Sequence, residues 1–523
     1  MKFMHYDQNQ SLLLPPLLSD CLPEDHICFI ISDTVDHLDL STIENSYSEE
    51  GHPAYHPKMM VKLLFYAYSQ GVRSSRKIEN KTNEDIAFRY LAANTHIDHG
   101  TVNLFRKNHL SELPTIFAQI VLITSKLGLA DLTDISLDGT KIKAQASKTN
   151  LFTKDGIAAL KKKIETILSD AEKVDLDEDK EFGSERGYNQ IPKNLANPKT
   201  RRKEIEKLQR KLADLDKADK TIDRKEKKAK EDDEKNRKTK AGQKEQDKMS
   251  THTTNTTDPD SKLMKMKDGS YKMAYNVQLA TANQFITAYS VADDYGDNKS
   301  LPEMVAKAEK NSGQKVKTTK ADSAYFNKEN IRFLKANQTE ALIPDTKMEH
   351  EQKQEARFGI GRFDRKNFTY DQESDCFICP EGKTLVRKGI ARDTDGKEKH
   401  REYRGKQCES CAVRTQCTKG KKRYIYVDLE LDAYRDEMRE KLNSGKGKAK
   451  YQARFYEIEP VFGNLKHNQN FTEFLCRGKT MASIELGLAS SAHNLKKIYF
   501  ALKRKGIKRK EILWDNQPSI QAI

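Results

Sequence analysis

The order of the apolar segments between residues 257 and 346 limits the possible folds more than any other feature of the sequence. Two apolar stretches, 271–280 and 285–291, flank a short turn and predict a pair of neighbouring strands. The segments that follow alternate between helix and strand, at 301–310, 316–322, 328–335 and 341–344. With an earlier apolar strand within 132–144, this order predicts an α/β fold with a mixed five-stranded sheet flanked by helices, not an all-parallel sheet.

The rest of the chain divides by composition, because 523 residues are too many for one compact core. The predicted segments are an all-helical domain at 1–130, the first strand of the core at 131–150, a charged helical arm at 151–256, the core strands and helices at 257–346, a cysteine-rich insertion at 347–428, and C-terminal helices at 429–523. Within the arm, Ile205, Leu208, Leu212 and Leu215 follow coiled-coil spacing and predict a helical hairpin. Residues 221–250 are almost all charged or polar and predict a flexible tip.

The N-terminal 130 residues combine short, capped helices with basic side chains. Pro57 can start one helix, and Gly71 follows its end. The basic residues between these helices are Arg73, Arg76, Lys77, Arg89, Arg106 and Lys107. This pattern resembles a helix-turn-helix DNA reader, although a helical bundle with solvated basic faces would give the same pattern. The formal net charge of +15 favours a polyanionic partner, so we expect sequence-specific DNA binding from this domain.

No apolar run approaches the roughly 20 residues that a membrane span requires. The apolar patch at 12–14 is broken by Pro15 and Pro16 and lacks the flanks of a signal peptide. We therefore expect a cytoplasmic protein with no membrane partner.

Two carboxylates stand at the ends of apolar stretches. Asp138 comes just before Gly139, and Asp322 ends the stretch 316–322. Reacting groups gather at strand ends of open sheets. A hard ion such as Mg²⁺ takes oxygen ligands, and two ions about 3.5–4 Å apart can activate an attacking hydroxyl and stabilise the leaving oxygen of a phosphodiester. Such a site needs about three carboxylates from separate segments, and two aspartates alone are more readily explained as turn formers.

A third carboxylate occurs in segment 451–466, which reads YQARFYEIEPVFGNLK. Tyr451 and Arg454 are separated by two residues, and Glu459 and Lys466 by six. The segment resembles the Tyr-x2-Arg-x3-Glu-x6-Lys signature of DDE transposases from bacterial insertion sequences. Four residues instead of three lie between Arg454 and Glu459. Because the spacing from Glu459 to Lys466 fits the signature, this departure concerns the match of Arg454 more than that of Glu459.

Further pieces of the chain are similar to the same family and occur in the same order. They are Asp138-Gly-Thr-Lys, Tyr275-Asn-Val-Gln, Ala321-Asp322, a Cys379-Pro pair in an insertion, Arg477-Gly478 and Asn494-Leu-Lys. Each piece is weak by itself, and their order carries the resemblance.

The resemblance implies a transposase that cleaves DNA strands and transfers them at the ends of an insertion sequence, with an RNase H-like core. Asp138, Asp322 and Glu459 would be catalytic and would hold two Mg²⁺ (or Mn²⁺) ions. The implied DNA-contacting residues are Tyr451, Arg454, Lys466 and Arg477. The implied partners are double-stranded DNA, as terminal inverted repeats and as target, and a second copy of the chain in a homodimeric synaptic complex. The implied location is the nucleoid of a bacterium.

Several other acidic residues compete for these roles. Glu457 could replace Glu459 as metal ligand, but the two point about 200° apart on a helix, so at most one faces the site. We interpret Glu457 as a solvated helical residue. Asp258 and Asp260 also resemble the family pattern, and a cap or turn explains them better. Helix capping is the expected role of Asp293, Asp294 and Asp297.

Five of the eight cysteines cluster between residues 376 and 417. Cys379, Cys408, Cys411 and Cys417 could hold a structural Zn²⁺ ion, and Cys376 offers a spare fifth ligand. Reduced thiols without a metal are the alternative.

Overall fold

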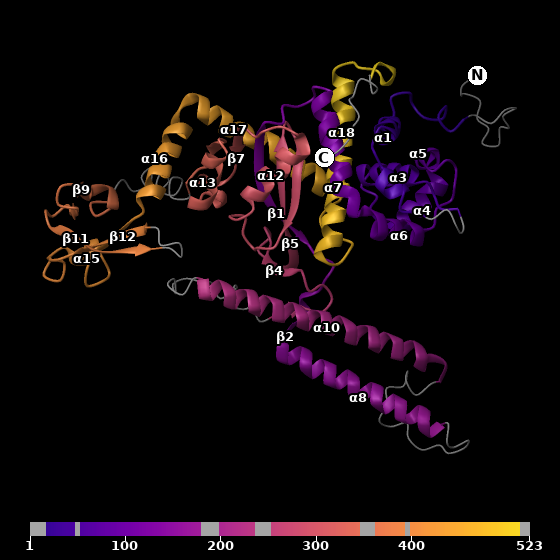
Figure 1. The fold of residues 1–523 in the computed structure, drawn as a ribbon, viewed down its shortest axis with the longest axis horizontal. Helices are drawn as coiled ribbons and strands as arrows, with labels where there is room; N and C mark the ends of the chain where they lie inside the picture. Colours follow the sequence, from indigo (N-terminus) through magenta and orange to yellow (C-terminus); the bar gives the residue numbers. More distant parts are fainter. Residues whose placement is uncertain are drawn as a thin grey trace, which may run out of the picture.

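The computed structural model describes residues 17–47, 53–178, 198–235, 253–345, 361–392 and 398–512. The molecule is elongated (Figure 1). A central sheet lies between the N-terminal helices on one side and, at the far end, a small β-rich insertion, while a long helical hairpin lies alongside.

The central sheet contains six strands and combines antiparallel with parallel pairs. Its order is β4-β5-β1-β7-β8, and β6 also pairs with β5. The bounds are β1 Asp134–Lys143, β4 Lys262–Lys265, β5 Tyr271–Ala282, β6 Phe285–Ala292, β7 Thr318–Lys320 and β8 Glu340–Leu342. β5 is antiparallel to β1, β4 and β6, whereas β7 runs parallel to β1 and β8 parallel to β7. The sheet is mixed, as the sequence predicts.

The prediction of five strands is wrong by one. β4 pairs with the first four residues of β5, next to the part of β5 that pairs with β6. Its four residues, Lys-Leu-Met-Lys, are too short and too polar to give a strand signal in the sequence.

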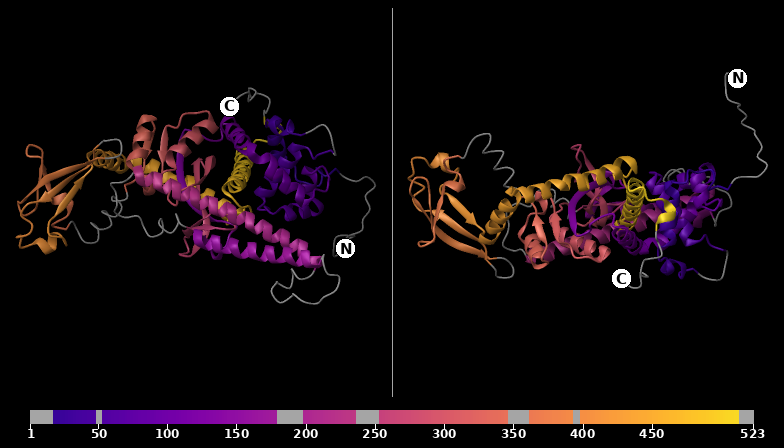
Figure 2. Two further views of the ribbon diagram at one scale, coloured as in Figure 1. Left: turned by 60° about the horizontal axis from the view of Figure 1, so that its bottom comes forward. Right: turned by 90° about the horizontal axis from the view of Figure 1, so that it is seen from above.

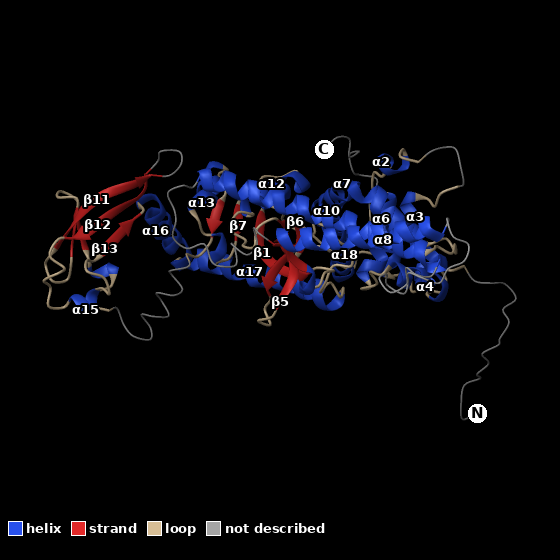
Figure 3. Cartoon of the chain, turned by 90° about the horizontal axis from the view of Figure 1, so that it is seen from below, coloured by secondary structure: helices blue, strands red, loops and turns tan. Residues whose placement is uncertain are grey.

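Helices cover both faces of this sheet (Figure 3). α12 (Leu301–Ser312) and α18 (Lys479–Arg504) pack against β6, and α17 (Gly445–Gly463) packs against β1 and β5. α13 (Lys328–Ala336) contacts β8. Strands β5 and β6 are buried almost along their whole length, which explains their nearly continuous apolar sequence.

The N-terminal region is helical where it is described, and it shares one apolar core with the sheet. Its helices are α1 Ile27–Asp36, α2 Ser41–Glu44, α3 Pro57–Ser69, α4 Ser75–Glu84, α5 Ile86–Leu91, α6 His99–His109 and α7 Leu113–Lys126. α3 and α7 pack directly against α18.

Two of the six basic residues that suggested DNA contact are buried inside this region. Arg73 pairs with Glu485 of α18 at 2.8 Å, and its guanidinium lies over the ring of Phe471. Arg106 donates to the backbone oxygen of Arg73. Arg73 therefore joins the N-terminal helices to the rest of the molecule, and Arg106 supports the backbone of Arg73. Arg76, Lys77 and Lys107 are exposed.

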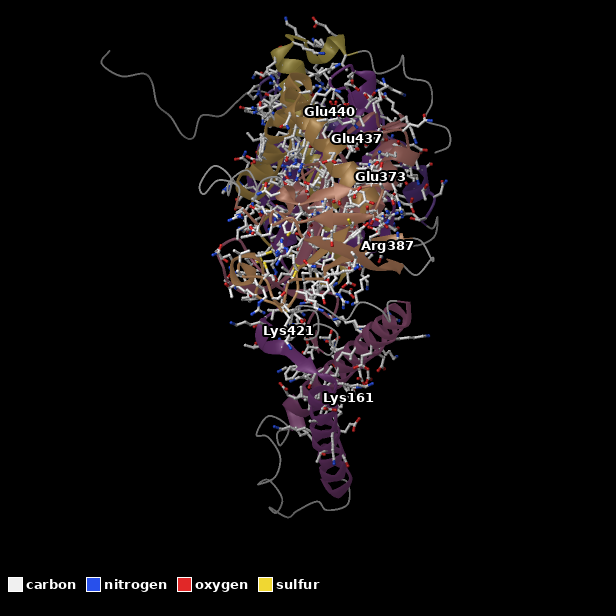
Figure 4. The ribbon with its side chains drawn as sticks, turned by 90° about the vertical axis from the view of Figure 1, so that its left-hand side faces the viewer. Lys161, Glu373, Arg387, Lys421, Glu437 and Glu440 are labelled. Carbon is white, nitrogen blue, oxygen red and sulfur yellow. The ribbon has the colours of Figure 1, made fainter. Side chains whose placement is uncertain are left out.

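The arm is a helical hairpin of α8 (Lys154–Glu178) and α10 (Pro198–Lys235), closed at its base by β2 (Leu151–Thr153) and β3 (Thr253–Asn255). The two helices run side by side (Figure 1 and the left panel of Figure 2). Ile157, Ile164, Leu215, Ala218 and Ile222 form their shared core. Lys161, labelled in Figure 4, pairs with Asp216 and Asp219 across the hairpin.

The predicted flexible tip at 221–250 is wrong for its first part. Residues 221–235 continue α10, and Ile222 is fully buried against α8. Ile222 continues the apolar face that packs against α8, so the helix extends here although the surrounding residues are charged. Residues 236–250 lie outside the described part.

The insertion forms a separate five-stranded antiparallel sheet, seen at the left of Figure 1 and from its own end in Figure 4. The strands are β9 Thr369–Asp371, β10 Cys376–Ile378, β11 Thr384–Arg392, β12 Glu398–Gly405 and β13 Tyr424–Val427, with the short helix α15 (Arg414–Cys417) before β13. α16 (Leu429–Asn443) leads back to α17. None of the described helices is long and apolar enough to cross a membrane.

Candidate metal and nucleic-acid site

The pairing of β1 with β7 brings Asp138 and Asp322 together. The two strands are parallel, and Ser136 lies opposite Lys320. Asp138 lies two residues further along β1, and Asp322 lies two residues after the end of β7, in extended backbone at the start of a 3-10 turn. Successive residues of a strand alternate between faces, so both aspartates continue the face of Ser136 and Lys320.

Asp138 does not precede a turn, contrary to the prediction from its glycine. β1 continues to Lys143, and Gly139 lies opposite Gln278 of β5. A Cβ atom at Gly139 would lie 2.4 Å from Asp297 Oδ1 and 2.5 Å from Gln278 Nε2. The glycine is therefore explained by close approach of these side chains and not by backbone turning.

The carboxyl groups of both aspartates are partly buried, and their pKa values are raised. Burial raises the pKa of Asp138 to about 6, the nearby Arg454 opposes this, and Asp322 and Asp297 add to it. Burial also raises the pKa of Asp322, again opposed by Arg454 and increased by Asp297. The carboxyl groups of Asp138, Asp322 and Asp297 therefore lie close together, and Arg454 is a positive charge near both Asp138 and Asp322.

Asp297 is the residue that the sequence interpretation missed. Its side chain accepts hydrogen bonds from Asn276 at 2.9 Å and from Gln278 at 2.5 Å, instead of capping α12. Gln278 in turn accepts a hydrogen bond from the hydroxyl of Tyr325, three residues after Asp322. The signal for this network is the pair of polar residues, Asn276 and Gln278, inside an otherwise apolar strand.

α17 and the helical turn Asn464–Asn468 that follows it bring two basic side chains to the same region. Arg454 is only 6% exposed and its guanidinium lies 3.3 Å from Asp138 Oδ2. Lys466 donates to Thr140, two residues beyond Asp138, at 2.6 Å, and burial lowers the pKa of its amine. The burial of Arg454 favours a role in holding Asp138 over a contact with DNA phosphate.

The two glutamates of α17 have opposite surroundings. Glu459 is exposed, about two turns before Lys466 on the helix. Glu457 is 15% exposed, pairs with the buried Lys320 at 2.7 Å, and accepts a hydrogen bond from Ser136. The interpretation of Glu457 as a solvated residue is therefore wrong, because it is held by a buried ion pair.

The remaining expected DNA-contacting residues lie elsewhere on the C-terminal part. Tyr451 packs partly buried against the core, with its ring 6.2 Å from that of Phe455. Arg477 is exposed, next to Gly478, whose amide donates to the buried Asp258. Asp258 also accepts a hydrogen bond from Tyr275, and Asp260 accepts one from the amide of Lys479 at the start of α18.

Four cysteines of the insertion line one small cavity. Cys379, Cys408, Cys411 and Cys417 surround a space of about 30 Å³, together with residues such as Lys383, Arg414 and Arg423. Cys376 is buried in β10 and does not line this cavity.

A different group, Glu79, Asp98 and His99, places three possible metal-ligand atoms within 4.8 Å of one another. It lies at the surface between α4 and α6, and Asp98 also caps α6 by accepting from Thr101. Its hydrogen bonds explain it without an ion.

Family comparisons match two separate parts of the chain. Residues 378–499 match the transposase DDE domain, and residues 16–108 match the transposase domain DUF772. The first match includes Glu459, Lys466 and the four cavity cysteines, whereas Asp138 and Asp322 lie outside both matches. No curated protein and no solved structure matches the chain. The two matches cover less than half of the chain and show that each of these regions is similar to a transposase domain.

Proposed function

We propose that the chain cleaves DNA strands at the ends of an insertion sequence and joins them to target DNA, using divalent metal ions held by Asp138, Asp322 and Glu459. The observation that carries this proposal is the parallel pairing of β1 with β7, after which Asp138 and Asp322 lie close enough for their carboxyl groups to interact. The strand order β6-β5-β1-β7-β8, with helices on both faces, supports an RNase H-like core.

The donor set fits a hard divalent cation. The pKa of each aspartate carboxyl is raised mainly by burial and further by neighbouring carboxylates, so Arg454 alone does not balance the negative charge of the ionised pair. Mg²⁺ or Mn²⁺ prefers carboxylate oxygens and would supply that charge. Glu457 faces the sheet beside Ser136 and is already neutralised by Lys320, whereas Glu459 is exposed and has no described contact with either aspartate. The choice of Glu459 as the third ligand therefore rests on its spacing to Lys466.

Each neighbouring side chain has a role in this proposal. Arg454 orients Asp138. Asp297 accepts hydrogen bonds from Asn276 and Gln278 of β5, the strand next to the one that carries Asp138. Lys466 lies beside Thr140 and offers a point charge to a DNA phosphate. Tyr451 and Arg477 are kept as further DNA-contacting residues. When bound, two metal ions would activate the attacking hydroxyl and stabilise the leaving oxygen. The chain's own contribution is to position groups and to neutralise charge.

Double-stranded DNA is the proposed partner, as terminal repeat and as target, with two copies of the chain in the synaptic complex. Residues 16–108, which match a transposase domain and are helical over much of their described part, are proposed to read the repeat sequence. A rival function is DNA binding without chemistry, by a chain whose core no longer cuts.

A strand-cleavage assay separates these two functions. The full chain is incubated with DNA that carries the ends of its own element, in Mg²⁺ or in EDTA. We expect cleavage in Mg²⁺ only, and loss of cleavage with retained end binding in Asp138→Asn and Asp322→Asn. Binding without any cleavage by the wild-type chain would favour the rival.

A further inference from the structure

We propose that Cys379, Cys408, Cys411 and Cys417 form a structural zinc site that holds the insertion together. The four residues come from two separate loops. Cys379 directly follows β10, in the turn that leads to β11, and the other three lie between β12 and β13. Their convergence on one cavity of about 30 Å³ is the central observation. A cavity needs roughly 10–15 Å³ to hold a single water, so this one has room for one ion.

Four of the five cysteines in the insertion line the cavity, and Cys376 does not. Cys376 is only two residues before the turn, yet its side chain is buried between neighbouring strands and faces away from the cavity. Four thiolates and no fifth ligand match the closed, four-coordinate arrangement of structural zinc sites. A disulfide framework would need only pairs and would not require four sulfur atoms around one space.

The surroundings are suited to thiolates that carry charge. Lys383, Arg414 and Arg423 line the cavity, and the amide of Lys383 donates to Cys379 Sγ at 3.3 Å. The buried Nε of Arg423 has no hydrogen-bond partner among the described residues, while its other nitrogens bind the backbone oxygens of Cys417 and Phe363. A metal-bound thiolate would accept from this orphaned donor.

Gly405 is explained by the same site. A Cβ atom at this position would lie 2.2 Å from Cys408 Sγ, so only glycine lets the β12 backbone approach the thiol. The four sulfur atoms do not form a group whose ligand atoms all lie within 4.8 Å, so a bound ion would draw the two loops inward.

The insertion also has little else to stabilise it. Its core consists of six buried side chains: Phe368, Phe377, Leu385, Tyr403, Ile425 and Val427. Cys379 and Cys417 pack against this cluster, so a metal would extend the core at its open end. Small units with few buried apolar residues commonly depend on a metal or on disulfides.

The test is the metal content of the full chain, purified under reducing conditions without chelator. We expect about one zinc ion per chain, and X-ray absorption with four sulfur neighbours at about 2.3 Å. Cys379→Ser, Cys408→Ser, Cys411→Ser and Cys417→Ser should each reduce the zinc content to near zero, whereas the matched control Cys376→Ala should retain it.

Two results would overturn the proposal. One is wild-type protein that contains no zinc and takes up none from a zinc-buffered solution after reduction. The other is a site that loses zinc in Cys376→Ala but keeps it in Cys417→Ser. If a serine variant fails to fold, the sulfur count from the wild-type absorption spectrum still decides, because fewer than four sulfur ligands contradicts the assignment.

Discussion

At the scale of single residues, Glu457 and Glu459 show how neighbouring carboxylates on one helix acquire different roles. Glu457 is held between Ser136 and the buried Lys320, and Lys320 also pairs with Asp134 at 2.9 Å. Glu459 is exposed. The proposed chemistry therefore assigns stability to the first glutamate and metal binding to the second.

The substitutions Glu457→Gln and Glu459→Gln should separate these roles. Glu457→Gln removes the charged partner of a buried lysine, and we expect it to lower the free energy of unfolding by roughly 1.5–3 kcal/mol while cleavage persists. Glu459→Gln should leave the free energy of unfolding unchanged and abolish cleavage. Stability is measured by urea denaturation and cleavage on element ends in Mg²⁺. An inactive Glu457→Gln beside an active Glu459→Gln would exchange the two assignments.

Gly139 provides a second prediction at this scale. Gly139→Ala would push its methyl group against Asp297 and Gln278. We expect a loss of roughly 1–3 kcal/mol in unfolding free energy, because the side chains beneath Asp138 must move. Cleavage should fall by about tenfold or more at unchanged DNA binding, because misplacing a catalytic group is costly.

Gly445→Ala, at the exposed start of α17 with no atom within 4 Å of the new methyl group, is the control and should change neither quantity. A Gly139→Ala chain with full activity and stability would show that the close approach has no consequence.

At the scale of elements, α18 connects the parts of the core through a buried histidine. The Nδ1 atom of His493 accepts from Asn464 of the helical turn after α17, and Nε2 donates to the backbone oxygen of Gln284 between β5 and β6, each at 2.8 Å. This pattern requires the neutral ring. Burial lowers the pKa of His493 to about 4.

Acid should therefore destabilise the protein through α18. A folded-state pKa below the unfolded value of about 6.5 means that unfolding takes up a proton as the pH falls below 6.5. The contribution of His493 is fully present above that pH and should decrease by about 2 kcal/mol between pH 7 and pH 5. The check is the unfolding free energy of the wild type at both values against His493→Gln, which should lack this part of the decrease. An equal decrease in both proteins would exclude His493 as the cause.

The sequence predicts these elements much better than it predicts their contacts. Strands β5, β6, β7 and β8 and helices α12 and α13 occur close to the expected positions, because each has its own apolar period. β4 and the helical residues 221–235 were missed, because their structure depends on pairing with a distant segment. Asp138 and Asp322 could be proposed as strand-end carboxylates, but the reason for Gly139, the role of Asp297 and the burial of Arg454 depend on side chains brought in from other strands and helices.

At the scale of the whole molecule, the N-terminal helices and the part that contains the central sheet cannot be treated as independent pieces. They share one apolar core and the buried pair between Arg73 and Glu485. DNA recognition by residues 1–130 is therefore best tested in the full chain. The exposed basic residues available for that test are Arg76, Lys77 and Lys107.

Replacing these three residues together by alanine should weaken binding to the element's end. If they contact only phosphates, binding should weaken equally for end and random DNA, and the dependence of log affinity on log salt should become shallower by about 0.9 per lost contact. If the helices also read bases, the preference for the end should fall as well. We expect loss of preference, measured by competition titration at 50 and 200 mM salt. An unchanged preference and an unchanged salt slope would remove this face from the DNA interface.

The central claim is that Asp138, Asp322 and Glu459 bind the metal ions that cut DNA, and replacing each by cysteine tests it most directly. A thiolate is a soft ligand that binds Mg²⁺ poorly and accepts Mn²⁺ more readily. The measurement is strand cleavage by Asp138→Cys, Asp322→Cys and Glu459→Cys in Mg²⁺ and in Mn²⁺, with end binding as a control for folding. We predict no cleavage in Mg²⁺ and partial recovery in Mn²⁺ for each variant. Cleavage at the wild-type rate in Mg²⁺ by any of the three would contradict its assignment as a metal ligand.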